Sequence, residues 1–293
     1  MEDLPKHLLR AALRRMGYRL SRIPAGTAAA TLVGGSDWEH LYYQALEQFK
    51  MSEAMRDIHR QDAAEIEALY RRFLFTDLPP REGRSRDLSD LIGTTVSEAI
   101  YVIKNLHDGL KIDGDICEFG VAQGATSALL AYEIRNTDKN IWLYDSFQGL
   151  PKPTVKDQLK DDIFQLGSMA AYEGTMACPI EMVQARLMEI GFPISRTRII
   201  PGFIESTWLG KRNLPSRVAF AYVDFDLYSP ILFTLNLLDQ ILVNQGFIIV
   251  DDYDFFSTGA KAAVDEFIAT KRDQYFFGLP VSSAGHFCVI QKL

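Results

Sequence analysis

Gly114-Asp-Ile-Cys-Glu-Phe-Gly-Val-Ala-Gln-Gly124 is the stretch that decides the fold of this 293-residue chain. The apolar residues around Glu118 predict a short strand, which breaks into a glycine turn and continues as a helix over residues 125–135. Gly120 allows the backbone to turn sharply at the end of the strand, and we expect Gly124 to let the helix begin close to a bound ligand.

The free N–H groups at the start of that helix suit a negatively charged or polar ligand group. The turn is not the G-x-G-x-x-G pattern of dinucleotide-binding enzymes, because Ala122 stands two positions after Gly120. An ordinary strand–turn–helix with two glycines explains this stretch about as well as a cofactor site does, so the interpretation depends on the rest of the chain.

Strand and helix patterns alternate from this stretch to the C-terminus, which predicts an α/β fold: a mostly parallel sheet with helices on both faces. We expect a clean start for the helix over 230–243, with Ser229 as N-cap and Pro230 as its first residue. Ligands bind at the carboxyl ends of the strands in such folds. The predicted strands cover residues 115–119, 141–145, 197–201, 218–224, 246–251, 276–280 and 286–291, and the helices cover residues 125–135, 178–190, 230–243 and 258–271.

Residues 1–87 predict an N-terminal helical extension, separate from a domain over residues 88–293. Within the extension, residues 4–22 predict a basic amphipathic helix. Such a helix can lie on an anionic membrane surface, but we favour packing on the domain or on a second subunit. Two more helices are predicted over 37–50 and 61–75, followed by a loop over 76–86. Thr95-Val-Ser-Glu98 then predicts a capping box for a helix that ends at Gly109.

Composition limits the classes of function. An apolar fraction of 47% and a charged fraction of 24% are typical of a globular protein. The net charge of −7 argues against nucleic acid as the main partner. Cys117, Cys178 and Cys288 give neither a disulfide framework nor a zinc pattern. No membrane-spanning run or secretion signal is visible, so we expect a cytoplasmic protein.

Carboxylates follow three of the predicted strands. Asp145 ends the second strand, and its spacing from Gly120 is close to that at which an acidic group binds a ribose diol. A helix or turn cap is the alternative. Asp224 ends the fourth strand and Asp251-Asp252 ends the fifth. Neighbouring strands lie roughly 5 Å apart, so Asp224, Asp251 and Asp252 can converge on one point.

A set of buried carboxylates is costly unless a cation compensates it. Oxygen ligands without clustered His or Cys suit Mg²⁺ before Zn²⁺. Asp226, two residues after Asp224, is a candidate ligand or supporting group. The alternative is that all of these are ordinary strand-end carboxylates bonded to helix N-termini.

Four motifs together resemble the macrocin O-methyltransferase (TylF-type) family of S-adenosylmethionine (SAM) dependent sugar O-methyltransferases. They are the Gly114–Gly124 stretch, Tyr-Asp145-Ser-Phe-Gln-Gly-Leu-Pro151, Val-Asp224-Phe-Asp-Leu-Tyr-Ser and Val-Asp251-Asp252-Tyr, within a resemblance that covers residues from about 88 to 293. The resemblance implies a class I methyltransferase (Rossmann-like) fold with a seven-stranded sheet. It also implies methylation of a hydroxyl on a sugar or glycoside in natural-product or glycan biosynthesis.

The resemblance implies residue roles as well. It places a divalent cation, Mg²⁺ first, on Asp224, Asp251 and Asp252. Asp224 is also the first choice for the catalytic base, because Leu227 occupies the position where related catechol-type enzymes keep a lysine. His286 is the second choice, and segment 151–177 matches the variable lid over the acceptor. SAM is expected at Glu118, Gly120, Gly124, Thr126, Asp145, Ser146, Gly202 and Phe203.

Two readings from other classes stay open. A SAM-binding scaffold without catalysis would bind the cofactor but show no metal-dependent turnover, and the intact set of aspartates argues against it. A nicotinamide-dependent oxidoreductase is disfavoured by the glycine pattern. Besides a small-molecule glycoside, the partners to be considered are a second copy of the chain and the inner membrane surface, the latter through residues 4–22.

Overall fold

The computed structural model describes residues 53–91, 93–207 and 213–293. Contacts divide the chain into two compact units, Met1–Val96 with Ile163–Gln165, and Ser97–Asp162 with Leu166–Leu293. The helices predicted over residues 4–22 and 37–50 lie outside the described residues. Among the helices that are described, none is both long enough and apolar enough to cross a membrane.

The first unit contains α3 (Glu53–Phe73) and α4 (Arg84–Ser89), which contact each other. This unit contains a buried ion pair between Arg84 and Glu67. Arg84 Nη1 lies 2.8 Å from Glu67 Oε1 and also donates to Pro79 O. Helix α4 packs on α3, and both lie within this unit. The domain boundary at residue 87 stays a prediction.

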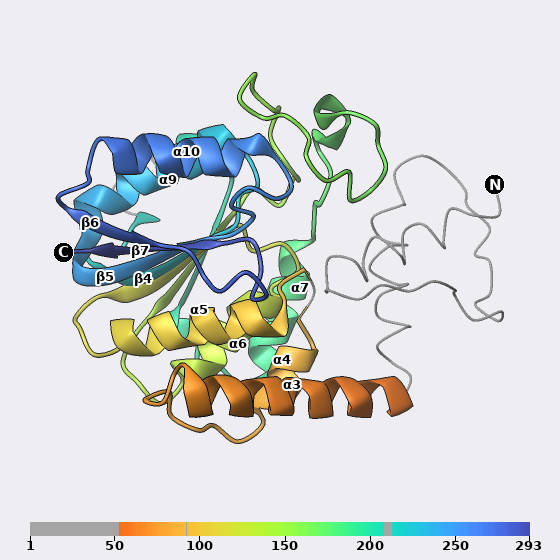
Figure 1. The fold of residues 1–293 in the computed structure, drawn as a ribbon, viewed down its shortest axis with the longest axis vertical. Helices are drawn as coiled ribbons and strands as arrows, with labels where there is room; N and C mark the ends of the chain where they lie inside the picture. Colours follow the sequence, from red (N-terminus) through yellow and green to blue (C-terminus); the bar gives the residue numbers. More distant parts are fainter. Residues whose placement is uncertain (1–52, 92, 208–212) are drawn as a thin grey trace. The chain divides into compact units, whose positions relative to one another are not determined.

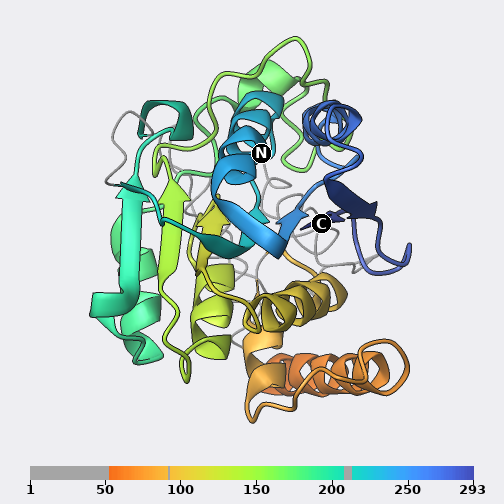
Figure 2. The same cartoon turned by 90° about the vertical axis from the view of Figure 1, so that its left-hand side faces the viewer.

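A seven-stranded sheet forms the centre of the second unit. The order across the sheet is β3-β2-β1-β4-β5-β7-β6. Strands β1 to β5 pair in parallel, and the arrows of β1, β2 and β3 point to one edge in Figure 2. Strand β7 runs antiparallel to β5 and β6. The predicted mostly parallel sheet is confirmed, with β1 (Asp115–Phe119), β2 (Ile141–Asp145), β3 (Thr197–Pro201), β4 (Val218–Val223), β5 (Leu242–Val250), β6 (Tyr275–Gly278) and β7 (Cys288–Lys292).

Helices cover both faces of this sheet (Figure 1). One face packs against α5 (Val96–Gly109), α6 (Ala125–Glu133) and α7 (Ile180–Glu189), and the other against α9 (Tyr228–Ile241) and α10 (Thr258–Ala269). Side chains of β4 alternate between the two layers, because successive residues of a strand point to opposite faces. Both faces are buried, which explains the unbroken apolar run of this strand. Short helical turns complete the unit: η1 (Met169–Tyr172), η2 (Ile194–Arg196) and α8 (Ile204–Thr207).

Two predicted boundaries beside the sheet were wrong. Helix α9 begins at Tyr228, so Ser229 lies inside it, and its N-cap Leu227 makes no side-chain cap. Asp157 supplies the cap instead, since its Oδ1 accepts the Tyr228 N–H at 2.7 Å. Strand β5 begins at Leu242, directly after α9, and its pairing with β4 contains an irregularity before Phe247.

Candidate functional site

The glycine turn follows β1 and is held against the end of β4. Gly120 has φ 89°, and a Cβ at this position would lie 1.9 Å from the Asp224 carbonyl oxygen. The Asp224 N–H donates to Phe119 O at 2.7 Å, so the two strand ends are bonded directly. Only glycine fits this close approach. The region after β4 that carries Asp224 therefore adjoins the glycine turn.

Gly124 lies where two helices approach each other, and its expected role beside a ligand stays a prediction. It is the N-cap of α6 with φ 77°, and an added Cβ would lie 3.1 to 3.2 Å from atoms of Val183 on α7. The close approach at Gly124 is thus between two helices. The sequence could not distinguish a helix neighbour from a ligand, because both require the same small residue.

Asp145, at the end of β2, holds the glycine turn by hydrogen bonds. Its Oδ2 accepts the N–H groups of Val121 and Ala122 at 2.8 and 2.9 Å, and its Oδ1 accepts the Phe147 N–H at 2.7 Å. Two consecutive N–H groups of the turn therefore face a carboxylate, as they would face an anionic or polar ligand. Asp145 therefore has the turn-capping role that we gave as the alternative, and its binding of a ribose stays a prediction.

Two more of the expected cofactor residues lie beside Asp145. The Gly202 N–H donates to Asp145 O at 2.8 Å, and the Ser146 hydroxyl donates to Gly149 O at 2.9 Å. Phe203 is partly buried, and its carbonyl accepts the Ser206 hydroxyl at 2.8 Å. The structure thus brings the glycine turn, the end of β2 and the end of β3 together. Thr126 is buried in the first turn of α6.

Glu118 is a buried residue of β1, with 1% of its surface exposed. Its Oε2 accepts the Ser127 hydroxyl from α6. Burial raises the pKa of Glu118 to about 8, although the hydrogen bond from Ser127 lowers it. This carboxyl links β1 to the first turn of α6, so it fixes the start of the helix that follows the glycine turn.

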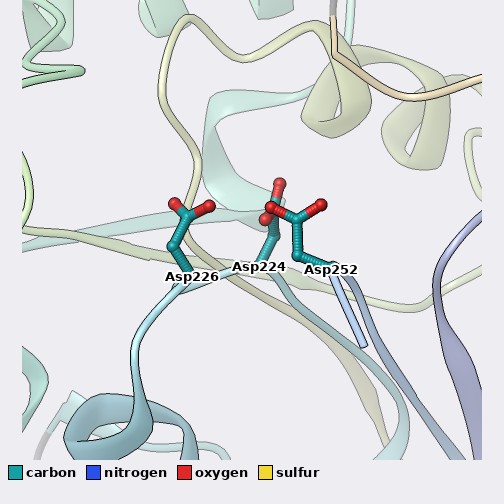
Figure 3. Close-up of side chains that lie close together, drawn as sticks. All are labelled: Asp224, Asp226 and Asp252. Atoms are coloured by element: carbon teal, nitrogen blue, oxygen red, sulfur yellow. The ribbon is translucent and has the colours of Figure 1, made fainter. Parts of the chain in front are cut away.

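Three aspartates meet beyond the ends of β4 and β5, and we call Asp224, Asp226 and Asp252 the aspartate cluster (Figure 3). One carboxylate oxygen from each lies within 4.8 Å of the other two. Asp226 and Asp252 are 6% and 5% exposed, while Asp224 is partly exposed. In the part of the chain that the structure describes, no second group of His, Cys, Asp or Glu side chains has this geometry.

The aspartate cluster contains Asp226, which we gave as a candidate ligand or supporting group, and not Asp251, which the resemblance implied as a ligand. Asp226 and Asp252 have φ values of 59° and 53°, a left-handed conformation that Asp tolerates better than most residues. The Ser257 hydroxyl donates to Asp226 O and accepts the Gly259 N–H, which ties the turn after β4 to the start of α10. Turns of this shape change the direction of a side chain, so the position of Asp251 outside the cluster did not follow from its place at a strand end.

Asp251 points into a buried group with Tyr222 and Glu98. Its Oδ2 accepts the Tyr222 hydroxyl at 2.7 Å, and its Oδ1 accepts the Asp252 N–H at 2.7 Å. Burial raises the pKa of Glu98 well above its usual range, and the negative charge of Asp251 raises it further. Asp251 is therefore bonded behind the aspartate cluster.

His286, the second choice for a base, is not part of the aspartate cluster. Its ring is exposed and stacks on Phe255, with centroids 4.6 Å apart.

Comparison with known proteins identifies the family. Residues 94–275 match the family described as Macrocin-O-methyltransferase (TylF), and this match covers more than half of the chain. The chain belongs to the TylF family. The resemblance carried by the four motifs is therefore confirmed.

Two curated relatives are similar to this chain, and both are O-methyltransferases by name. An 8-demethyl-8-(2,3-dimethoxy-alpha-L-rhamnosyl)-tetracenomycin-C 4'-O-methyltransferase from Streptomyces olivaceus is 31% identical, over 50% of this chain and 55% of its own length. The Mycinamicin III 3''-O-methyltransferase from Micromonospora griseorubida is 31% identical, over 50% of this chain and 58% of its own length. The chain thus spans little more than half the length of these curated relatives.

A solved structure supports the fold. The O-methyltransferase NovP aligns with a TM-score of 0.58 at 19% identity, covering 81% of this chain and 99% of that one. The chain therefore has the class I methyltransferase fold that the sequence predicted.

Sequence reasoning missed Glu98 and Tyr222, which lie beside Asp251. Glu98 was assigned to a capping box, yet its buried carboxyl lies beside Asp251 and Tyr222. One signal was available, since the alternation of β4 places Tyr222 on the same face as Phe220, the face that α5 covers.

Proposed function

We propose that this protein is a SAM-dependent O-methyltransferase that methylates a hydroxyl of a sugar or glycoside in natural-product biosynthesis. The observation that carries the proposal is the contact between Gly120 and Asp224, which joins the glycine turn to the aspartate cluster at one sheet edge. Family membership and the names of the relatives support the reaction and the acceptor class. Transfer of labelled methyl groups from SAM to glycosides tests the proposal.

The proposed SAM site is the crevice edge formed by the glycine turn and the ends of β2 and β3. SAM supplies an electrophilic methyl group when it is bound. Asp145 can accept hydrogen bonds from the ribose while it holds the turn, because each carboxylate oxygen can accept more than one bond. The remaining residues proposed for the site are Glu118, Gly120, Gly124, Thr126, Ser146, Gly202 and Phe203, of which Glu118 and Gly124 act through the position of α6.

Asp145→Ala should weaken SAM binding by about 1–3 kcal/mol, the range for lost hydrogen bonds to a charged acceptor. The variant loses ribose bonds and also leaves the Val121 and Ala122 N–H groups without their carboxylate. Calorimetric titration with SAM measures the change. Asp113→Ala is the matched control, because Asp113 lies before β1 in an exposed pair with Arg217. Equal SAM affinity in parent and Asp145→Ala would remove Asp145 from the site.

The aspartate cluster is the proposed metal site, with Asp224, Asp226 and Asp252 as ligands and Asp251 behind them. The residues fit a hard divalent cation such as Mg²⁺, because all the donors are oxygens and three close carboxylates repel one another without a cation. A bound divalent cation lowers the pKa of a hydroxyl that it contacts. The cluster thus offers the environment that a sugar hydroxyl needs to lose its proton.

Asp224 is the proposed proton acceptor. It is partly exposed, whereas Asp226 and Asp252 are buried, which favours Asp224 as the carboxylate that meets the acceptor. The chain then contributes mainly orientation and exclusion of water around the reacting oxygen.

We further propose a cytoplasmic location. Cys117, Cys178 and Cys288 all lie in the described residues, where they are buried and form no disulfide, as expected in a reducing compartment.

A further inference from the structure

A buried polar group lies behind the aspartate cluster and has no role in the proposed reaction so far. It consists of Glu98 from α5, Tyr222 from β4 and Asp251 after β5. Their exposed fractions are 3%, 1% and 5%. Burying two carboxyl groups and a phenol together is costly unless their hydrogen bonds are satisfied among themselves.

The hydrogen bonds within this group fix the direction of each donor. Tyr222 Oη lies 2.7 Å from Asp251 Oδ2 and 3.2 Å from Glu98 Oε1. A phenol carries one hydrogen, so it donates to one carboxyl, and the shorter distance selects Asp251. Tyr222 can then accept a hydrogen bond from Glu98 when that carboxyl is protonated. Burial, together with the Asp251 charge, raises the pKa of Glu98 in the direction this requires.

Asp251 also forms a hydrogen bond with the main chain of Asp252, a member of the aspartate cluster. Its second oxygen, Oδ1, accepts the Asp252 N–H at 2.7 Å. Asp252 has φ 53°, which is unfavourable for a residue with a Cβ and persists only where its surroundings hold it. The bond from Asp252 N to Asp251 is one such restraint, and Asp251 in turn is held by Tyr222.

We propose that Glu98 is a positioning residue for the aspartate cluster: through Tyr222 and Asp251 it holds Asp252 in the left-handed conformation that directs its carboxylate toward Asp224 and Asp226. This inference rests on the proposed metal site. It assigns a role to a helix residue outside all four motifs, and it makes Asp251 a support of the cluster.

The test measures Mn²⁺ binding by calorimetry on the protein without acceptor, so that its readout is independent of turnover. Glu98→Leu removes the hydrogen bonds of Glu98 with Tyr222 and Asp251, and Tyr222→Phe removes the phenol bond to Asp251. Each variant should weaken Mn²⁺ binding about tenfold or more, the usual effect of losing a support behind metal ligands. Glu98→Gln should bind Mn²⁺ within about twofold of the parent, because its amide can still donate to Tyr222.

Glu133→Leu is the matched control. It removes a buried carboxyl from α6, where Glu133 pairs with His107 at 2.8 Å, and it should leave Mn²⁺ affinity unchanged. SAM affinity and Tm, measured for every variant, show that the fold is intact. Tyr222→Phe keeps the ring packing, so it remains informative if Glu98→Leu fails to fold.

Parent-like Mn²⁺ affinity in Tyr222→Phe would overturn the inference, as would equal losses in Glu98→Gln and Glu98→Leu. A parent protein that binds SAM but no Mn²⁺ would instead remove the proposed metal site, and the inference would fall with it. The parent titration therefore separates the failure of the site from the failure of the positioning role.

Discussion

Asp252→Asn should lower the rate of methyl transfer about 100-fold or more, while SAM affinity stays close to that of the parent. The substitution keeps the size of the side chain but removes one ligand charge from the aspartate cluster. It should not destabilise the fold, because the three carboxylates repel one another in the metal-free protein. Steady-state kinetics, SAM titration and thermal unfolding on the same preparations measure the three quantities.

Asp254→Asn is the matched control for this variant. Asp254 lies two residues further along and also has a positive φ, 64°, but its carboxylate is exposed and pairs with Lys160. Its substitution should leave turnover unchanged.

Exhaustive chelation of the parent with EDTA should stop methyl transfer without releasing SAM, and added Mg²⁺ should restore it. Full activity after chelation, with Asp252→Asn as fast as the parent, would reduce these aspartates to structural caps.

Gly120→Ala should lower Tm by about 10 °C, corresponding to a loss of roughly 3 kcal/mol, and should abolish measurable SAM binding. Its Cβ would lie 1.9 Å from the Asp224 carbonyl oxygen and 2.6 Å from the Asp224 carbonyl carbon. Both contacts are with main chain, which no side-chain rotation relieves. The ends of β1 and β4 must therefore separate, and both the glycine turn and the aspartate cluster are displaced.

Gly191→Ala separates this clash from the cost of a positive φ. Gly191 has φ 66° and nothing within 4 Å of its added Cβ, so only backbone strain of about 1 kcal/mol remains, or about 3 °C in Tm. SAM binding should be unaffected. If Gly120→Ala were no worse than Gly191→Ala, the direct joining of the two strand ends would be disproved.

Local sequence signals predicted the sheet well. Strands β1, β2 and β3 have the predicted bounds, because each is a short apolar run bordered by polar or turn residues. The start of α9 could not be predicted in this way. Its N-terminal N–H is capped by Asp157, which lies 71 positions earlier in the chain, while Ser229 only appeared to offer a local cap.

The candidate site shows the same limit. Asp145, Asp224 and Asp252 follow strand ends, so the sequence placed them at one edge of the sheet. The choice between Asp226 and Asp251 depends on the left-handed residues after β4 and β5, which alternation does not reveal. Glu98 reaches the site from a helix far away in sequence, and its bond with Tyr222 joins positions 124 residues apart.

The most direct measurement is transfer of the labelled methyl group from SAM to a panel of glycosides, including rhamnosyl tetracenomycin and mycinamicin substrates of the kinds named for the relatives. We predict that the label appears in a new O-methyl group on a sugar, with one S-adenosylhomocysteine formed for each product. A protein that binds SAM but transfers label to no glycoside, with Mg²⁺ present, would contradict the account and favour a SAM-binding scaffold.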